Sequence, residues 1–230
     1  MNFIVHKMQN KKTAKKFGAA NADYKTIFGK MDTLLLRVLI PKIPLWLETN
    51  HFTLLSLPLA LANIGIGFLV QSNIQFALLF VLTIGFNHTF DLLDGAIGRH
   101  RNTGLILWGF YMDKIVDFWF LASLCVGMAI AFSELQLLLL CLFIIFSSMF
   151  FHAALYFGAT GTYQKNYQYL GFTELKFTAI SLAILTAIGG EVLLRFSLLF
   201  LLLCGSIALT GIVYNSQKVI WIKDIENKQK

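Results

Sequence analysis

A stretch of 42 residues without Asp, Glu, Lys or Arg, from position 49 to position 90, constrains this chain more than any other feature. A helix of about 20 residues spans the hydrocarbon core of a bilayer, so this stretch has room for two membrane-spanning helices. The neutral turn Gln71-Ser72-Asn73 divides it. Hydrophobic residues make up 57% of the chain and charged residues 13%, against roughly 25% charged residues in soluble proteins. These values exclude a soluble or disordered protein.

Four further apolar segments lie downstream, at about 112–132, 136–157, 174–190 and 193–214. Each is long enough, or nearly so, to cross a hydrocarbon core of about 30 Å. The sequence therefore predicts an all-α integral membrane protein with six transmembrane helices. The segment 3–42 carries nine Lys and Arg residues and an apolar side, and it is too charged to cross. We expect it to form an interfacial amphipathic helix that lies on the bilayer.

Basic residues indicate which way the helices cross the membrane. Of the 19 Lys and Arg residues, 18 fall on the side of the two termini, and Arg195 falls on the other side. By the positive-inside rule, both termini are cytoplasmic. We attribute the net charge of +7 to interaction with the membrane and not to a nucleic-acid partner. We expect a basic N-terminal segment over 1–48, a six-helix transmembrane domain over 49–214 and a cytoplasmic tail over 215–230, in a bacterial inner membrane.

Four aspartates stand where the second predicted helix ends and the third begins. They are Asp91, Asp94, Asp113 and Asp117. Residues three or four apart share a helix face, so each pair projects from one side of its helix. Carboxylates within a membrane are unfavourable, and four of them close together repel strongly. The sequence therefore predicts positive charge among them.

Arg99 and Lys114 are nearby cationic side chains, but we expect neither to serve several carboxylates at once, and Lys114 is rotated about 100° from Asp113. Divalent cations fit better, because oxygen ligands at this density suit Mg²⁺ or Mn²⁺. Two such ions carry the four positive charges that four carboxylates lack. Since Mg²⁺ keeps positions open for water and phosphate, the aspartates indicate a site that handles phosphate.

Three glycines border these aspartates. Gly95 follows Asp94, Gly98 lies one turn further on, and Gly109 lies one turn before Asp113. Glycine destabilises a helix by about 1 kcal/mol relative to Ala, although small residues also serve close helix packing in membranes. Three glycines in register with the aspartates favour a flat surface for a bulky ligand.

The arrangement resembles the signature of the CDP-alcohol phosphotransferase family, Asp-x2-Asp-Gly-x2-Ala-Arg-x8-Gly-x3-Asp-x3-Asp. Seven of its eight fixed residues match. Gly98 replaces the Ala, and nine residues instead of eight separate Arg99 from Gly109. The matched positions are Asp91, Asp94, Gly95, Arg99, Gly109, Asp113 and Asp117.

The resemblance implies six helices around a polar cavity that is open to the cytoplasm, usually in a homodimer. It also implies a role for each signature residue. Asp91, Asp94 and Asp113 would bind two divalent ions, Mg²⁺ or Mn²⁺, and Asp117 would be the general base and a further ligand. Four residues would lie next to the CDP moiety, namely Gly95, Gly98, Arg99 and Gly109.

Weaker candidates lie outside the signature. Asn50 and Thr53 are similar to a Pro-Asn-x-x-Thr element of the family and would face the nucleotide, unless they only cap the helix. Asn87 and His88, one turn deeper than Asp91, would contact the acceptor or orient Asp91, unless they serve helix packing. Glu174 and Lys176 are candidates for recognition of the acceptor. The alternative is that they have no such role, since Lys is common at the cytoplasmic end of a membrane helix.

The resemblance implies that an acceptor hydroxyl attacks the phosphorus bearing the donor alcohol and that CMP leaves. Thr173-Glu174 resembles an element of the choline and ethanolamine branch, which favours slightly a CDP-aminoalcohol donor and diacylglycerol as acceptor. The alternative is CDP-diacylglycerol as donor to a small polar alcohol. A cation transporter or channel is the rival of another class, because carboxylates in membranes also mark ion pathways.

Overall fold

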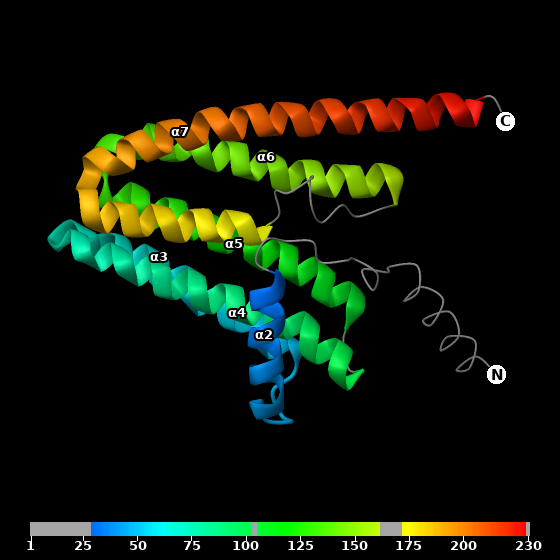
Figure 1. Ribbon diagram of the computed structural model, residues 1–230, viewed down its shortest axis with the longest axis horizontal. Helices are drawn as coiled ribbons and strands as arrows, with labels where there is room; N and C mark the ends of the chain where they lie inside the picture. Colours follow the sequence, from blue (N-terminus) through cyan, green and yellow to red (C-terminus); the bar gives the residue numbers. More distant parts are fainter. Residues whose placement is uncertain (1–28, 103–104, 162–171, 229–230) are drawn as a thin grey trace.

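The computed structural model describes residues 29–102, 105–161 and 172–228, and over these ranges the chain is helical, without a strand. Figure 1 shows long helices side by side, with the short α2 running across their direction. The helices are α2 (Gly29–Leu39), η2 (Ile40–Lys42), α3 (Thr49–Ser72), η3 (Ile74–Ala77), α4 (Leu78–Arg101), α5 (Ile106–Ala131), η4 (Ser133–Leu135), α6 (Gln136–Thr160) and α7 (Phe172–Lys228).

Five helices of the described ranges, namely α3, α4 with its η3 turn, α5, α6 with η4, and α7, are long and apolar enough to cross a membrane. The all-α membrane class is thus confirmed. The helix α7 has 57 residues, but its backbone is not helical at Gly190, where φ is 65° and ψ is −157°. Glycine reaches positive φ without strain. The chain reverses direction there, so that α7 has two arms (Figure 1).

Two predicted boundaries differ from the structure. The helix α5 begins at Ile106, about six residues before the predicted position, and its first turn is apolar but exposed, with Ile106 at 50% and Leu107 at 59%. The second arm of α7 continues to Lys228, through most of the tail predicted over 215–230. Residues such as Val219 and Ile222 keep that segment apolar between its charges, which sustains the helix.

Small and neutral polar residues hold α3, α4 and α5 together in the middle of the bundle. The Asn63 amide donates to Ser123 Oγ at 3.0 Å, and Thr83 Oγ1 donates to Asn63 Oδ1 at 2.6 Å. A Cβ atom on Gly67 would collide with the carbonyl of Gly127, so the two backbones approach closely. Interhelical contacts of this kind replace the hydrophobic effect as the source of packing in a membrane.

The helix α2 packs on the ends of α3 and α4. Its Leu36 and Leu39 contact a cluster of buried residues formed by Phe52, Leu93 and Ile97. Its remaining apolar side chains, such as Leu34, are exposed. This two-sided apolar character agrees with a helix that also contacts lipid. The rest of the predicted interfacial segment, residues 3–28, lies outside the described residues.

Arg101, at the end of α4, holds the connection between η2 and α3. Its guanidinium donates to the carbonyl oxygens of Ile43 at 3.0 Å and Leu47 at 2.6 Å, and to those of Pro44 and Leu45 at longer range. The helix α3 then begins after Glu48, whose N–H donates to the His51 side chain at 3.1 Å. Glu48 and His51 therefore cap α3, and the capping role considered for Asn50 and Thr53 is wrong.

Candidate functional site

Three carboxylates meet between α4 and α5. Asp91 comes from α4 and Asp113 and Asp117 from α5, and one oxygen of each lies within 4.8 Å of the others. The four-residue spacing on α5 places its two aspartates on one face, as predicted. The antiparallel neighbour α4 brings Asp91 against that face. We call this end of the bundle the acidic end, and Asp117 is its most buried member, at 9% exposure.

Two lysines neutralise the acidic end. Lys176 Nζ, from the first turns of α7, lies 2.7 Å from Asp91 Oδ2 and 3.4 Å from Asp117 Oδ1. Lys114 Nζ lies 2.6 Å from Asp113 Oδ2 and 3.8 Å from Asp117 Oδ2. The expectation that Lys114 does not serve several carboxylates is therefore wrong. Each lysine bridges two of them, because its long flexible side chain overcomes the rotation of its position on the helix.

Asp94 lies outside the group of three. Its Oδ2 accepts a hydrogen bond from Thr53 Oγ1 at 3.0 Å, and its carbonyl oxygen accepts one from Thr49 Oγ1 at 3.0 Å. The carboxylate is thus held against the first turns of α3. We expected Thr53 to face a nucleotide, and in the structure its hydroxyl group hydrogen-bonds to Asp94, an aspartate of the signature. The contribution of Thr49 was missed, although its place four residues before Thr53 on one helix face was visible in the sequence.

The signature glycines differ in their surroundings. A Cβ on Gly95 would lie 3.1 Å from the Arg99 guanidinium, so Gly95 makes room for the side chain one turn ahead. Gly109 has open space where a Cβ would stand, as a ligand surface requires. Gly98 is buried, and Arg99 is exposed. A nucleotide contact by these residues remains a prediction.

The weaker candidates are spread around the acidic end. Asn87 is 1% exposed, and within the described part of the chain its Oδ1 has no hydrogen-bond partner. His88 points elsewhere, toward Asp32 of α2 at 3.0 Å. Asn50 and Glu174 are half-buried near the starts of α3 and α7. Of this set, Lys176 contacts the carboxylates of Asp91 and Asp117.

Asp32 was missed as a candidate. A signal was present, since Asp32 stands four and seven residues before Leu36 and Leu39 and so shares their apolar face. A carboxylate on such a face requires a partner when it is buried.

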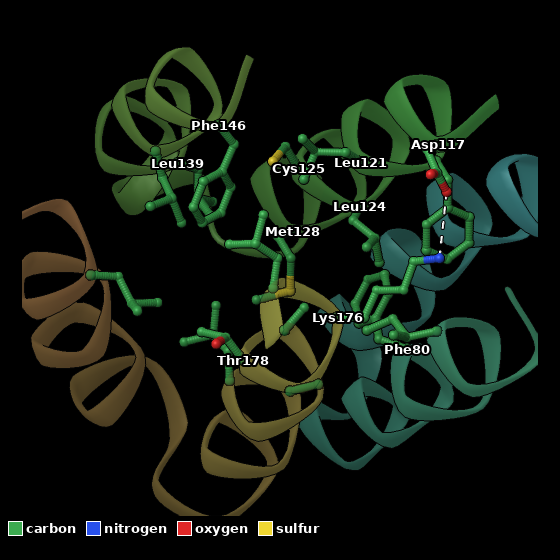
Figure 2. Close-up of a pocket in the computed structure, with 18 of the residues that line it drawn as sticks. Phe80, Asp117, Leu121, Leu124, Cys125, Met128, Leu139, Phe146, Lys176 and Thr178 are labelled. Carbon is green, nitrogen blue, oxygen red and sulfur yellow. Dashed lines mark ion pairs between the residues drawn. The ribbon is translucent and has the colours of Figure 1, made fainter. Parts of the chain in front are cut away.

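An apolar cavity adjoins the acidic end. Asp117 and Lys176 lie on one side of it, and Leu139 and Phe146 lie on the other (Figure 2). The space, including its open side, is about 960 Å³, and side chains of α4, α5, α6 and α7 line it. Apart from Asp117, Lys176 and Thr178, its lining residues are apolar or are cysteine. Such a lining suits hydrocarbon, directly beside a carboxylate.

The three carboxylates fit a hard divalent cation. Mg²⁺ and Mn²⁺ prefer oxygen ligands, and oxygens within 4.8 Å of one another can share one ion. Asp91, Asp113 and Asp117 would hold it. An ion in this position can face a bound phosphate group, because Mg²⁺ is octahedral and three carboxylate oxygens would leave positions for water and phosphate.

Comparison with curated proteins finds no match. Among solved structures, the fold is similar to a phosphatidylinositol phosphate synthase of Mycobacterium tuberculosis, solved with CDP-DAG bound, with a TM-score of 0.57 and 18% sequence identity. The match covers 83% of this chain and 93% of that protein. The family model for CDP-alcohol phosphatidyltransferases matches residues 46–212, which include α3 to α6 and most of α7. With the acidic end inside the matched range, the chain belongs to the CDP-alcohol phosphatidyltransferase family and is a phosphotransferase enzyme of phospholipid synthesis.

Proposed function

We propose that this enzyme transfers a phospho-alcohol group from a CDP-alcohol to the hydroxyl group of an acceptor alcohol and releases CMP. The observation that carries the proposal is the meeting of Asp91, Asp113 and Asp117 within 4.8 Å, on residues of the family signature. We further propose six transmembrane segments over 49–214, with α7 contributing two, and both termini and the acidic end in the cytoplasm. A homodimer and a bacterial inner membrane complete the proposal.

Asp117 is the proposed general base. It is the carboxylate that borders both the other aspartates and the apolar cavity, so a hydroxyl on a lipid can reach it. Asp117 takes the hydroxyl proton, and the acceptor oxygen attacks the phosphorus that bears the donor alcohol. The bond between that phosphorus and the oxygen bridging to the CMP phosphate breaks, and CMP leaves with the bond electrons.

The other residues bind and orient the substrates. Lys176 and Lys114 balance the charge of the carboxylates and keep Asp117 fixed between them. Arg99 is exposed beside Gly95 and can pair with phosphate oxygens through its planar fork. Divalent ions, of which we propose two, would withdraw charge from the diphosphate when bound and stabilise the leaving CMP phosphate.

Diacylglycerol is the acceptor that we favour, with a CDP-aminoalcohol as donor. The apolar cavity supports this choice, because it places space for hydrocarbon next to the proposed base. CDP-diacylglycerol as donor to a small polar alcohol is the second candidate. It is favoured by the fold neighbour, which was solved with CDP-DAG bound.

CMP release by the purified protein tests both candidates. One reaction contains Mg²⁺, diacylglycerol and CDP-choline or CDP-ethanolamine, and the other contains CDP-diacylglycerol with serine, inositol, choline or glycerol phosphate. We expect CMP in the first reaction, whereas CMP in the second alone would establish the alternative. Protein in liposomes that conducts Mg²⁺ or protons without any CDP-alcohol, and releases no CMP, would instead identify the transporter of the rival class.

A further inference from the structure

The helix α2 places a buried carboxylate against the helix that carries Asp91. Asp32 is 7% exposed and His88 is 8% exposed, and Asp32 Oδ1 lies 3.0 Å from His88 Nε2. Because an ionised carboxylate only accepts hydrogen bonds, Nε2 carries the proton and donates it. Within the described residues, the other ring nitrogen, Nδ1, is buried without a partner. The hydrogen bond from Asp32 therefore orients the ring.

His88 in turn contacts the first turns of α7. The rings of His88 and Phe177 lie 5.7 Å apart between centroids and meet edge to face at 64°. Phe177 follows Lys176, whose ammonium group bridges Asp91 and Asp117. A series of contacts thus runs from Asp32 through His88 to Phe177, whose chain neighbour Lys176 contacts the carboxylates. We call it the α2 series.

Anchoring of α2 does not require this buried pair. Leu36 and Leu39 already pack α2 against Phe52, Leu93 and Ile97. Burying a carboxylate carries a desolvation penalty, and well-packed apolar residues often stabilise a fold equally well or better. Orientation of the His88 ring therefore explains the buried pair of Asp32 and His88 better than a contribution to stability does.

We propose that Asp32 and His88 are positioning residues for the transfer reaction, acting through Phe177 to hold Lys176 between Asp91 and Asp117. The proposal rests on the proposed function, since it assigns these residues to the same site. Partners that orient the groups contacting a metal or substrate commonly affect activity or metal affinity by about 10- to 100-fold when they are removed. The helix α2 thereby becomes part of the catalytic unit.

A double-mutant cycle on turnover tests the proposal. We expect Asp32→Asn to lower kcat for CMP release by about tenfold in the wild-type background, with little change in KM for the donor. In the Lys176→Met background, the same change should have less than about a twofold further effect, because non-additivity marks residues that act through one another. Equal effects in the two backgrounds, or an unchanged kcat in Asp32→Asn, would overturn the proposal.

Matched variants separate positioning from folding. His88→Phe retains a ring against Phe177 but loses the hydrogen bond to Asp32, so it should behave like Asp32→Asn. His88→Leu loses both contacts and should lower kcat at least as much. Asp224→Asn makes the same chemical change on an exposed carboxylate near the end of α7 and should leave kcat unchanged. If Lys176→Met does not fold, Phe177→Leu takes its place in the cycle.

Mn²⁺ binding without substrate gives a readout that is independent of turnover. Lys176→Met removes a positive charge beside Asp91 and Asp117, so calorimetry should show tighter Mn²⁺ binding. Asp32→Asn should shift binding in the same direction, and the double variant should match Lys176→Met. A variant with a lowered Tm but unaltered Mn²⁺ affinity would show a purely structural role and refute the inference. Wild-type protein that binds Mn²⁺ but releases no CMP would refute the proposed function alone.

Discussion

The acidic end of the bundle and the packed middle of α3, α4 and α5 are built on different principles. At the acidic end, Asp91, Asp113 and Asp117 lie close together, with two lysines bridging them. About 15 Å further along α5, Gly127 presses against α3, where no charged residue takes part. The same helices therefore carry a charged site and an uncharged packing seam, where α3 meets α5 at Gly127, and the difference predicts separate effects on turnover and stability.

Asp117→Asn should have the largest effect on turnover. Loss of a general base lowers kcat by about 100- to 10,000-fold, while the isosteric amide keeps the packing. CMP release measures the effect, and calorimetric binding of the CDP-alcohol is the control, which we expect to be preserved. Turnover near the wild-type rate would remove Asp117 from its role as base.

Asp91→Asn should act on the metal requirement. A charge-assisted interaction contributes about 1.5–3 kcal/mol, so replacing an anionic ligand with a neutral amide should raise the Mg²⁺ concentration for half-maximal activity by roughly 10- to 100-fold. The Mg²⁺ titration of CMP release measures it. Asp113→Asn should behave alike, and a titration curve identical to that of the wild type would contradict the assignment of these ligands.

Gly127→Ala tests the packing seam. A Cβ here would collide with the carbonyl of Asn63, so α3 and α5 must separate. Overpacking of this kind destabilises a protein by about 1–3 kcal/mol, which a detergent or urea unfolding curve would reveal. The kcat of the folded fraction should remain close to that of the wild type.

Gly65→Ala is the matched control for this substitution, since Gly65 has nothing within 4 Å of its Cβ position. Equal destabilisation by Gly65→Ala and Gly127→Ala would mean that glycine backbone effects, and not the contact between α3 and α5, determine the result.

The smallest effect is expected at the turn between the two arms of α7. Arg195 and Glu191 form an exposed ion pair at 3.0 Å, with side chains 49% and 42% exposed. Exposed pairs contribute about 0–1 kcal/mol, so Glu191→Gln should leave both kcat and the unfolding midpoint nearly unchanged. A loss of stability comparable to that of Gly127→Ala would show that this exposed ion pair contributes more than its exposure implies.

Local spacing made much of the site predictable. The apolar lengths identified membrane-spanning helices, and the four-residue interval placed Asp113 and Asp117 on one face because the helix period is fixed. The meeting of two helix ends led us to expect all four aspartates together, and the structure brings together Asp91, Asp113 and Asp117 but not Asp94. These features depend on short-range geometry or on a motif that lies within 27 residues.

Long-range contacts were not predictable in the same way. Lys176 stands 85 residues after Asp91, and no local pattern specifies that α7 brings it to the carboxylates. The partnership of Asp32 with His88 likewise depends on how α2 docks. The position of Asp94 against Thr53, away from the group of three, depends on the packing of α3 on α4. Tertiary packing decides such pairings, and sequence spacing does not.

The guanidinium of Arg101 has a consequence for motion. By gathering the carbonyl oxygens of the connection before α3, it fastens the last turn of α4 to that connection. The parts of α2, α3 and α4 next to the acidic end should then move as one rigid block. Widening of the site for a bulky substrate falls to the first arm of α7, and hydrogen exchange should find slow amides around Leu47 and faster ones near Lys176.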